Sequence, residues 1–285
     1  MSLGRNTTAG SLILLSAILG GCNSNPASSS PPVISAAEAN PPASQPASQP
    51  ARVPIAYFDF ASDSRITPAR VRELAEKYKK NVMIGADSGN SDSKATMAAA
   101  KAAGVFRHIY LEGPCGVTGN QGIAPDEMAR MKAGAKYAGI DTSKPDWRKQ
   151  WNESGWKVYT RHQIKDLYAD YDSYEIDNLY NGIGDSGAAL LAFLKEQQAW
   201  AKANGIKATI MLKNVESGQW PLIVKAVKSG ELSRDGLTDF CISEEDFNAR
   251  EKQKQAAAAA SIGIQQLDSL STYSYAARGE YRVGR

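Results

Sequence analysis

Short apolar runs alternate with longer amphipathic segments along most of the chain. Runs such as "VMIGAD" and "ATIMLK" have the length and composition of buried strands. The longer segments repeat apolar residues at helical spacing, as in "TPARVRELAEKYKK", where Thr67 can cap the helix and Pro68 fits its first turn. The pattern predicts strands at 53–60, 81–87, 105–113, 173–177, 206–214, 238–243 and 261–268. It predicts helices at 67–80, 91–104, 124–139, 161–171, 186–205, 218–230 and 244–260.

The segment 141–160 interrupts this rhythm. It is rich in aromatic and turn-forming residues, and its pattern predicts at most a short strand at 156–159. Elsewhere seven or eight strand–helix units follow one another, which favours a parallel sheet covered by helices. No strand is followed by a Gly-rich phosphate loop, and the near miss "NGIGDSG" has the wrong spacing. We therefore predict an α/β fold of the TIM-like (β/α)8 type rather than a doubly wound sheet, and leave open whether its C-terminal end is irregular or incomplete.

The first 52 residues have the features of an export signal and a tether rather than of a folded domain. Residues 1–22 have a basic start and an apolar run too short for a membrane span, and they end in "LGGC". This ending resembles the bacterial lipobox, which implies lipid attachment at Cys22; an ordinary secretory signal with a chance cysteine is the alternative. Residues 23–52 are rich in Pro, Ser and Ala and predict a disordered tether. Residues 53–285 then form the folded domain, held at the cell envelope, at the outer membrane if the cell is Gram-negative.

The composition of the chain bears on nucleic-acid binding, metal binding and disulfide formation. A net charge of +3 is too small to argue for nucleic acid. The chain has two histidines and no Cys/His cluster with metal-ligand spacing, so we expect no metal site. Cys115 and Cys241 could pair in an oxidising compartment, but their spacing does not require it.

Polar or charged residues follow the apolar part of nearly every predicted strand. These strand-end residues are Asp59, Asp87, Glu112, Asp177 with Asn178, Lys213 with Asn214, and Glu244 with Glu245. In an α/β barrel the carboxyl ends of the strands share one face, and that face carries the active site. An acidic residue after a strand can also be a simple helix cap, which is the favoured interpretation for Asp63 and Asp87 and is open for Glu245 and Asp246.

Glu175 and Asp177 stand two positions apart on one strand. Alternation places them on the same side, and both would point into the barrel. A buried carboxylate without a partner is costly, so the cation of Lys213 on the next strand is the expected partner. This arrangement suggests a catalytic purpose.

Three motifs in order resemble a known family. "YEIDNLY", "IMLKN" and "FCISEEDF" are similar to strand ends of the endo-α-1,4-polygalactosaminidase family of glycoside hydrolases, family 114, whose members are TIM-like barrels. The matching positions are Glu175, Asp177, Asn178, Leu212, Lys213, Asn214, Glu244 and Phe247. The resemblance covers roughly Tyr171 to Phe247. Ile176 replaces the family's usual Pro, Ser243 its usual Asn and Asp246 its usual Cys.

The resemblance implies hydrolysis of an α-linked amino-sugar polysaccharide, with Asp177 as nucleophile and Glu244 as general acid/base. Lys213 and Asn178 would keep Asp177 ionised, and crowding by Glu245 would keep a proton on Glu244. The residues expected to line the substrate cleft are Asp59, Glu112, Glu175, Asn178, Lys213, Asn214 and Glu245. Aromatic residues that could stack on sugar rings, or equally belong to the core, are Tyr57, Tyr110, Tyr174 and Trp220. No metal or organic cofactor is implied.

Two other functions stay open at this point. The altered "SEED" motif and the unfamiliar C-terminal sequence also suit a non-catalytic carbohydrate-binding lipoprotein on a degenerate barrel, because a fold does not guarantee an activity. A phosphate-binding sugar isomerase on the same barrel would need a phosphate loop that the sequence lacks.

Overall fold

The computed structural model describes residues 55–59, 67–88, 93–114, 125–243, 248–269 and 280–283. For 55–59, for 280–283 and for a few residues beside the gaps it describes the backbone alone. All of these residues belong to the second of two units into which the chain divides, Ser48–Arg285. The lipid attachment predicted at Cys22 and the tether predicted at 23–52 lie outside the described residues. Within the described ranges, no helix is both long and apolar enough to span a membrane.

The described residues form a sheet of eight strands. They are β1 (Ile55–Asp59), β2 (Val82–Asp87), β3 (Phe106–Leu111), β4 (Ser173–Ile176), β5 (Thr209–Lys213), β6 (Leu237–Ser243), β7 (Gln265–Ser269) and β8 (Glu280–Val283). Six parallel pairings join β1 to β7 in chain order. β8 runs antiparallel to both β7 and β1, and its pairings close the ring of strands. The predicted α/β class is confirmed.

The last strand answers the question that the sequence left open, because the C-terminal end of the barrel is irregular. Residues 261–268 were expected to supply the final strand, and they do supply β7. The closing strand is β8, which the sequence pattern did not predict and which is antiparallel rather than parallel. A chain that returns antiparallel needs no crossover helix, whereas a parallel eighth strand would need one.

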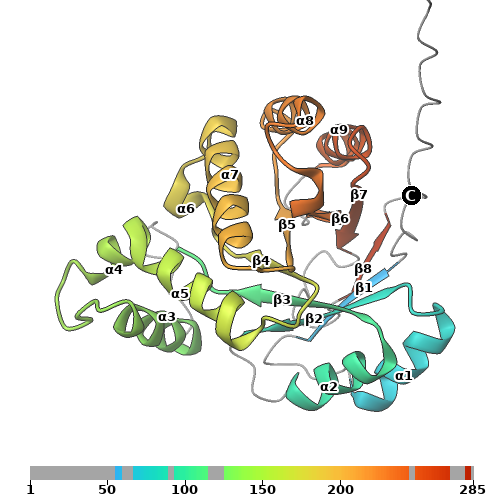
Figure 1. The fold of residues 1–285 in the computed structure, drawn as a ribbon, viewed down its shortest axis with the longest axis horizontal. Coiled ribbons are helices and arrows are strands. Elements are labelled where there is room, and N and C mark those ends of the chain that lie inside the picture. The colour runs from blue at the N-terminus through green and yellow to red at the C-terminus, as the bar shows by residue number, and fades with distance from the viewer. Residues whose placement is uncertain are drawn as a thin grey trace, which may run out of the picture. The chain divides into compact units, whose positions relative to one another are not determined.

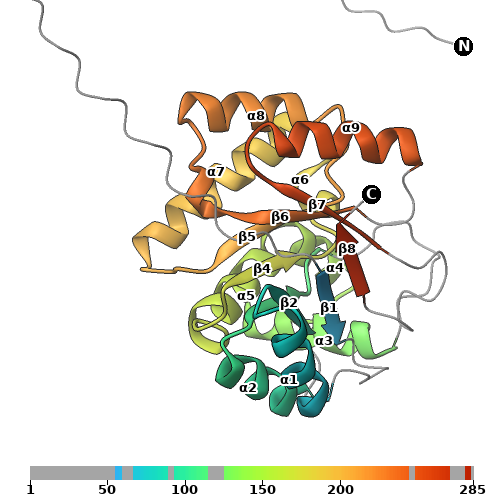
Figure 2. The same cartoon turned by 90° about the vertical axis from the view of Figure 1, so that its right-hand side faces the viewer.

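The helices follow the strands in chain order. They are α1 (Pro68–Lys77), α2 (Ser93–Ala103), α3 (Pro125–Tyr137), α4 (Trp147–Gln150), α5 (Trp156–His162), α6 (Tyr180–Ile183), α7 (Gly187–Ala203), α8 (Trp220–Ser229) and α9 (Ala249–Ala260). Two π-helical turns, η1 (Trp151–Gly155) and η2 (Gln163–Leu167), extend α4 and α5, and a 3-10 turn, η3 (Arg234–Gly236), precedes β6. Figure 1 shows α7, α8 and α9 next to one another along one flank of the sheet, with α1 and α2 paired on another flank. Figure 2 shows the strands crossing beneath α8 and α9.

Residues 141–146 form turns, as the composition predicted, but residues 147–160 are helical and the short strand predicted at 156–159 is wrong. Trp151 and Trp156 are fully buried in this helical stretch, and the Trp151 indole donates a hydrogen bond to the Gly113 carbonyl. Gly134 of α3 leaves room for the Trp151 ring, because a Cβ at this position would lie 2.7 Å from that ring. Tertiary packing of two tryptophans therefore overrides the strand preference of aromatic residues.

Two apolar clusters hold the fold together. The larger one lies between the sheet and its helices and includes Val71, Leu74, Ile109, Leu194 and Ile223. The smaller one joins side chains of β2, β5, β6 and β7, and consists of Met83, Met211, Phe240, Ile242 and Leu267, with Phe106 packed against it. Strands that are not neighbours can meet in this way only through their inner faces, so the smaller cluster fills part of the barrel interior.

Candidate functional site

The carboxyl ends of β4 and β5 form the site. Asp177 follows β4 directly, and Lys213 is the last residue of β5. The Lys213 Nζ lies 2.9 Å from Asp177 Oδ1 and donates a hydrogen bond to it. The two side chains are 11% and 21% exposed, so the pair is shielded but still reaches solvent. The ion pair expected from the sequence is present.

Several contacts favour the ionised form of Asp177. Burial raises the pKa of its carboxyl, but the Lys213 ammonium outweighs this effect with help from hydrogen bonds made by Tyr110, Lys213 and the backbone at Asn178. The pKa therefore lies below its ordinary value of 3.8. The Asn178 side-chain amide also donates to Asp177 Oδ2 at 2.7 Å. The Lys213 Nζ stands 4.8 Å from the centre of the Tyr110 ring, which adds a cation–π contact.

The backbone at the two strand ends has the same special geometry. Asn178 and Asn214 have φ angles of 51° and 53°, in the left-handed region that asparagine tolerates better than most residues. Each asparagine ends its strand and turns the chain away just after the charged residue. The expected roles of Asn178 and Asn214 beside substrate stay predictions, and asparagine suits the left-handed backbone at both positions.

Gly113 permits the close approach of β3 to the site. A Cβ at this position would lie 1.8 Å from the Asp177 carbonyl oxygen. The Asp177 amide donates to the Leu111 carbonyl at 3.0 Å, so β3 and the end of β4 are in contact through backbone alone. A glycine at this position is therefore part of what positions Asp177.

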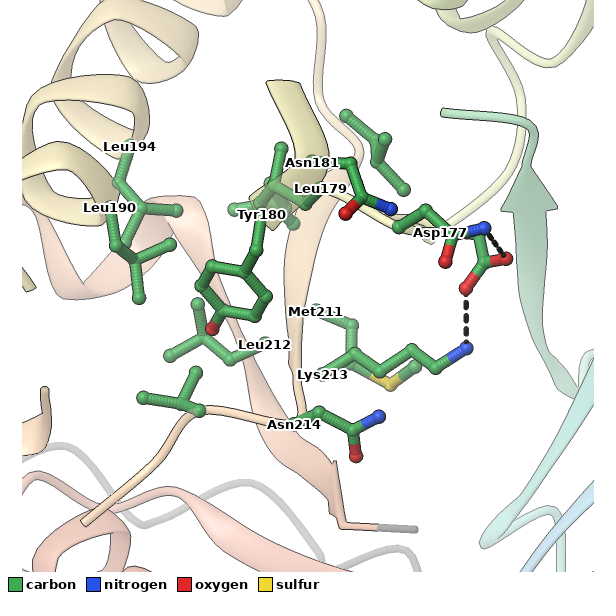
Figure 3. Close-up of a pocket in the computed structure, with 14 residues that line it drawn as sticks. Asp177, Leu179, Tyr180, Asn181, Leu190, Leu194, Met211, Leu212, Lys213 and Asn214 are labelled. Atoms are coloured by element: carbon green, nitrogen blue, oxygen red, sulfur yellow. Dashed lines mark hydrogen bonds and ion pairs between the residues drawn. The ribbon is translucent and has the colours of Figure 1, made fainter. Parts of the chain in front are cut away.

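A pocket of about 300 Å³ opens beside the ion pair. Its lining comes from the ends of β4 and β5 and from α6 and α7, and comprises Ile176, Asp177, Asn178, Leu179, Tyr180, Asn181, Leu190, Leu194, Ile210, Met211, Leu212, Lys213, Asn214 and Val215. Figure 3 shows Asp177 and Lys213 at one end of it, with Leu190 and Leu194 at the other. The pocket thus combines a charged end with an apolar wall, as small-molecule sites commonly do.

Glu175 points into the barrel, deeper than Asp177, as strand alternation predicted. Its side chain is 2% exposed, with Oε1 3.8 Å from Lys213 Nζ and Oε2 3.5 Å from His108 Nε2. These contacts are with residues of the site itself, and the expected contact of Glu175 with substrate stays a prediction. His108 is also fully buried, and its Nδ1 lies 2.7 Å from the Ser173 hydroxyl oxygen.

The sequence patterns did not identify His108, Tyr110 or Ser173 as residues of the site. Tyr110 was considered only for stacking on sugar rings. A signal was available, because His108 and Tyr110 alternate with apolar residues along β3 and therefore share one face of it. The register then sets them against Ser173 and Glu175 of β4, since His108 pairs with Ser173 and Tyr110 pairs with Glu175.

Glu112 and two of the aromatic candidates face the helix layer. Glu112 accepts a hydrogen bond from Arg130 of α3 at 3.1 Å, and its charge contributes to raising the pKa of Tyr159 in α5, after burial. Tyr174 is buried against α7, where it accepts a hydrogen bond from Gln197, and burial raises its pKa to about 12. Trp220 donates to the Val215 carbonyl within the core. Tyr174 and Trp220 are core residues, and a contact between Glu112 and substrate stays a prediction.

Other predicted site residues cannot be placed. Glu244 and Glu245 lie outside the described residues, as does Cys115, and Asp59 is described only by its backbone in β1. Cys241 is buried in β6. Among the residues whose side chains are described, no group of three or more His, Cys, Asp or Glu has the arrangement of a metal site.

Comparisons with known proteins give little further help. No protein-family profile matches the chain, and no curated protein matches it. One solved structure that is similar is a twin-arginine translocation pathway signal protein from Burkholderia phytofirmans, at 13% identity and a TM-score of 0.21. The match covers 70% of this chain, and this chain spans 62% of that protein. A likeness of this size supports no conclusion about activity.

Proposed function

We propose that this chain is a glycosidase on a TIM-like barrel, which hydrolyses an α-linked amino-sugar polysaccharide of the galactosaminan type. The observation that carries the proposal is the Lys213–Asp177 pair: a carboxylate held ionised at the carboxyl end of a parallel strand, beside a pocket. Active sites of α/β barrels lie at this end of the strands. An ionised carboxylate next to a cavity is also what a glycosidase nucleophile requires.

Asp177 acts as the nucleophile in this proposal. Its carboxylate attacks the anomeric carbon while the bond to the leaving glycosidic oxygen breaks, and an acid delivers a proton to that oxygen. Water then cleaves the glycosyl–enzyme bond and restores the carboxylate. Lys213 and Tyr110 lower the basicity of Asp177, which keeps it free of a proton at neutral pH.

Glu244 is the proposed general acid/base. The assignment rests on the family resemblance of "FCISEEDF" and on strand alternation. Two and four residues before Glu244, Ile242 and Phe240 of β6 belong to the interior cluster. No metal or organic cofactor enters this mechanism.

The deciding experiment is incubation of the full chain with acetylated and deacetylated α-1,4-linked galactosamine oligomers, with products identified by mass. The parent should shorten at least one of these oligomers. Asp177→Asn and Glu244→Gln should each lower the rate by about 10²-fold or more while still binding oligomer. Asp166→Asn is the matched control, because Asp166 is a surface residue paired with His162 at 2.6 Å.

Each result has a clear meaning. Full activity in Asp177→Asn would contradict the proposed nucleophile. A larger loss in Glu245→Gln than in Glu244→Gln would move the acid by one residue. Binding of oligomer without cleavage by the parent would instead support the non-catalytic carbohydrate-binding function.

We also propose that the protein is exported and anchored to the cell envelope by a lipid on Cys22. The support is the "LGGC" ending of a signal-like N-terminus, followed by a Pro/Ser/Ala-rich spacer. Cys22→Ala should move the protein from the membrane fraction to the soluble fraction and abolish incorporation of labelled lipid. Continued lipid labelling of the variant would disprove the anchor.

A further inference from the structure

A row of buried polar side chains continues from the site into the barrel. Starting at the mouth, it consists of Asp177, Lys213, Glu175, His108 and Ser173. Successive contacts measure 2.9 Å from Asp177 to Lys213, 3.8 Å from Lys213 to Glu175, 3.5 Å from Glu175 to His108 and 2.7 Å from His108 to Ser173. Side chains of three adjacent strands therefore form one continuous chain of charged and hydrogen-bonding groups.

The inner members of this row are buried. Glu175 is 2% exposed, and His108 and Ser173 are fully buried. Burying a carboxylate and an imidazole next to each other costs free energy that an apolar pair of the same size would not cost. Their most direct effect is on Lys213, because Glu175 Oε1 attracts the ammonium from behind while Asp177 attracts it from the mouth.

Register explains why the row is continuous. His108 lies opposite Ser173 across the β3–β4 pairing, and Glu175 follows Ser173 on the same inner face of β4. Glu175 Oε2 lies 3.5 Å from His108 Nε2, close enough for the field of the carboxyl group to act on the ring. The serine hydroxyl can donate or accept, and so it can complete the hydrogen bonding of Nδ1.

We propose that Glu175 and His108 are positioning residues, which hold Lys213 against Asp177 from inside the barrel and couple the state of the mouth to the ring of His108. As an account of catalysis this rests on the proposed function. The coupling itself is a property of the folded protein and can be measured without any substrate.

The sequence makes this measurement unusually clean. The chain contains only two histidines, the buried His108 and the partly exposed His162 on α5. Two-bond ¹H–¹⁵N correlation spectra of the full chain, labelled with ¹⁵N-histidine and held at one pH, should therefore show two ring patterns. His162→Gln removes one pattern and assigns the other to His108.

The test uses variants at both ends of the row. Asp177→Asn keeps the shape of the side chain at the mouth but removes its charge and replaces one acceptor oxygen by a donor NH2, and Glu175→Gln makes the same change next to the ring. We expect both substitutions to shift the ring ¹⁵N signals of His108 and to leave those of His162 in place. Asp166→Asn should do the opposite, because Asp166 contacts His162 at 2.6 Å.

The outcomes separate this inference from the proposed activity. Unchanged His108 signals in Asp177→Asn would overturn the coupling, and this variant keeps the side-chain shape should Glu175→Gln fail to fold. Shifted signals in a protein that cleaves no oligomer would uphold the coupling and reject the glycosidase. In an active protein, Glu175→Gln should lower kcat by about tenfold or more with little change in KM. A rise in KM with kcat unchanged would instead make Glu175 a substrate-binding residue.

Discussion

The barrel interior has an apolar part and a charged part, and β5 contributes to both. Met211 of β5 packs with Met83, Phe240, Ile242 and Leu267, whereas Lys213, two residues further along the same face, enters the ion pairs. The apolar part stabilises the fold by removing its surface from water. The charged part gains less, because attraction between buried charges is offset by the loss of their hydration.

This difference suggests what each part is for. A barrel could be filled entirely with apolar side chains, and replacing buried ion pairs by such residues is often neutral or stabilising. The charged side is thus better explained by chemistry at the mouth than by stability. Substitutions that act unequally on the two parts test this explanation.

The largest effect is expected at Lys213. Lys213→Met leaves Glu175 buried without its cation, and it should lower the free energy of unfolding by about 3–5 kcal/mol. Urea unfolding at pH 7 measures this. The matched control is Lys195→Met, because Lys195 makes an ion pair of nearly the same length, 2.8 Å to Glu231, between half-exposed side chains. No measurable change is expected there, and equal effects at the two lysines would contradict the importance of burial.

A somewhat smaller loss is expected at Gly113. Gly113→Ala forces a methyl group into the Asp177 carbonyl, so β3 and β4 must separate, at a cost of about 2–3 kcal/mol. The shift should also remove Asp177 from Lys213 and impair any activity. Gly218→Ala serves as the control, since a Cβ at Gly218 meets nothing within 4 Å. Thermal unfolding of both variants gives the comparison, and a Gly113→Ala protein as stable as Gly218→Ala would show that the strands can move apart at little cost.

One conservative substitution in each part of the barrel interior shows how well the charged and apolar parts tolerate change. Ser173→Ala removes the hydroxyl that contacts His108, and it should cost about 1–2 kcal/mol because a buried ring nitrogen loses a partner. Met211→Leu nearly preserves volume in the apolar part and should cost less than about 1 kcal/mol. Chemical unfolding of the two variants side by side checks the order. A larger loss of stability in Met211→Leu than in Ser173→Ala would show that the charged part tolerates substitution better than the apolar part.

The smallest effect is a pH dependence at Asp177. Its pKa is lower in the folded protein than the ordinary 3.8, chiefly because Lys213 offsets the effect of burial. The carboxylate therefore contributes stability above about pH 4. That contribution disappears as the pH falls through the lower, folded-state pKa. Unfolding free energies of the parent and Asp177→Asn, measured from pH 6 to pH 2, should converge at the acid end. A constant difference across this range would exclude the linkage.

Local patterns in the sequence were sufficient to predict the central elements. β2, β3, β5 and α7 lie where apolar runs, caps and helical spacing placed them, and the ion pair of Lys213 with Asp177 followed from alternation on β4. These features depend on neighbours in sequence or on a single strand pairing. They are the kind of signal that periodicity carries.

The remaining features depend on contacts that sequence patterns do not contain. Trp151 and Trp156 belong to helices because of what packs against them, which their own propensities do not reveal. The internal role of Glu175 required the register between β3 and β4, which brings His108 beside it. The antiparallel direction of β8 depends on pairing with a strand from the start of the domain.

This late pairing has a consequence for how the protein is made. β1 is the first strand of the domain, and Tyr57 finds its partner Glu280 only when the last strand joins the barrel. Until then one edge of β1 stays unpaired. An unpaired strand edge is a template for other chains, so this interval is when the nascent protein is most exposed to aggregation. Deleting 280–285 would make that interval permanent, and we expect such a shortened chain to associate through β1 and β7 rather than remain a monomer.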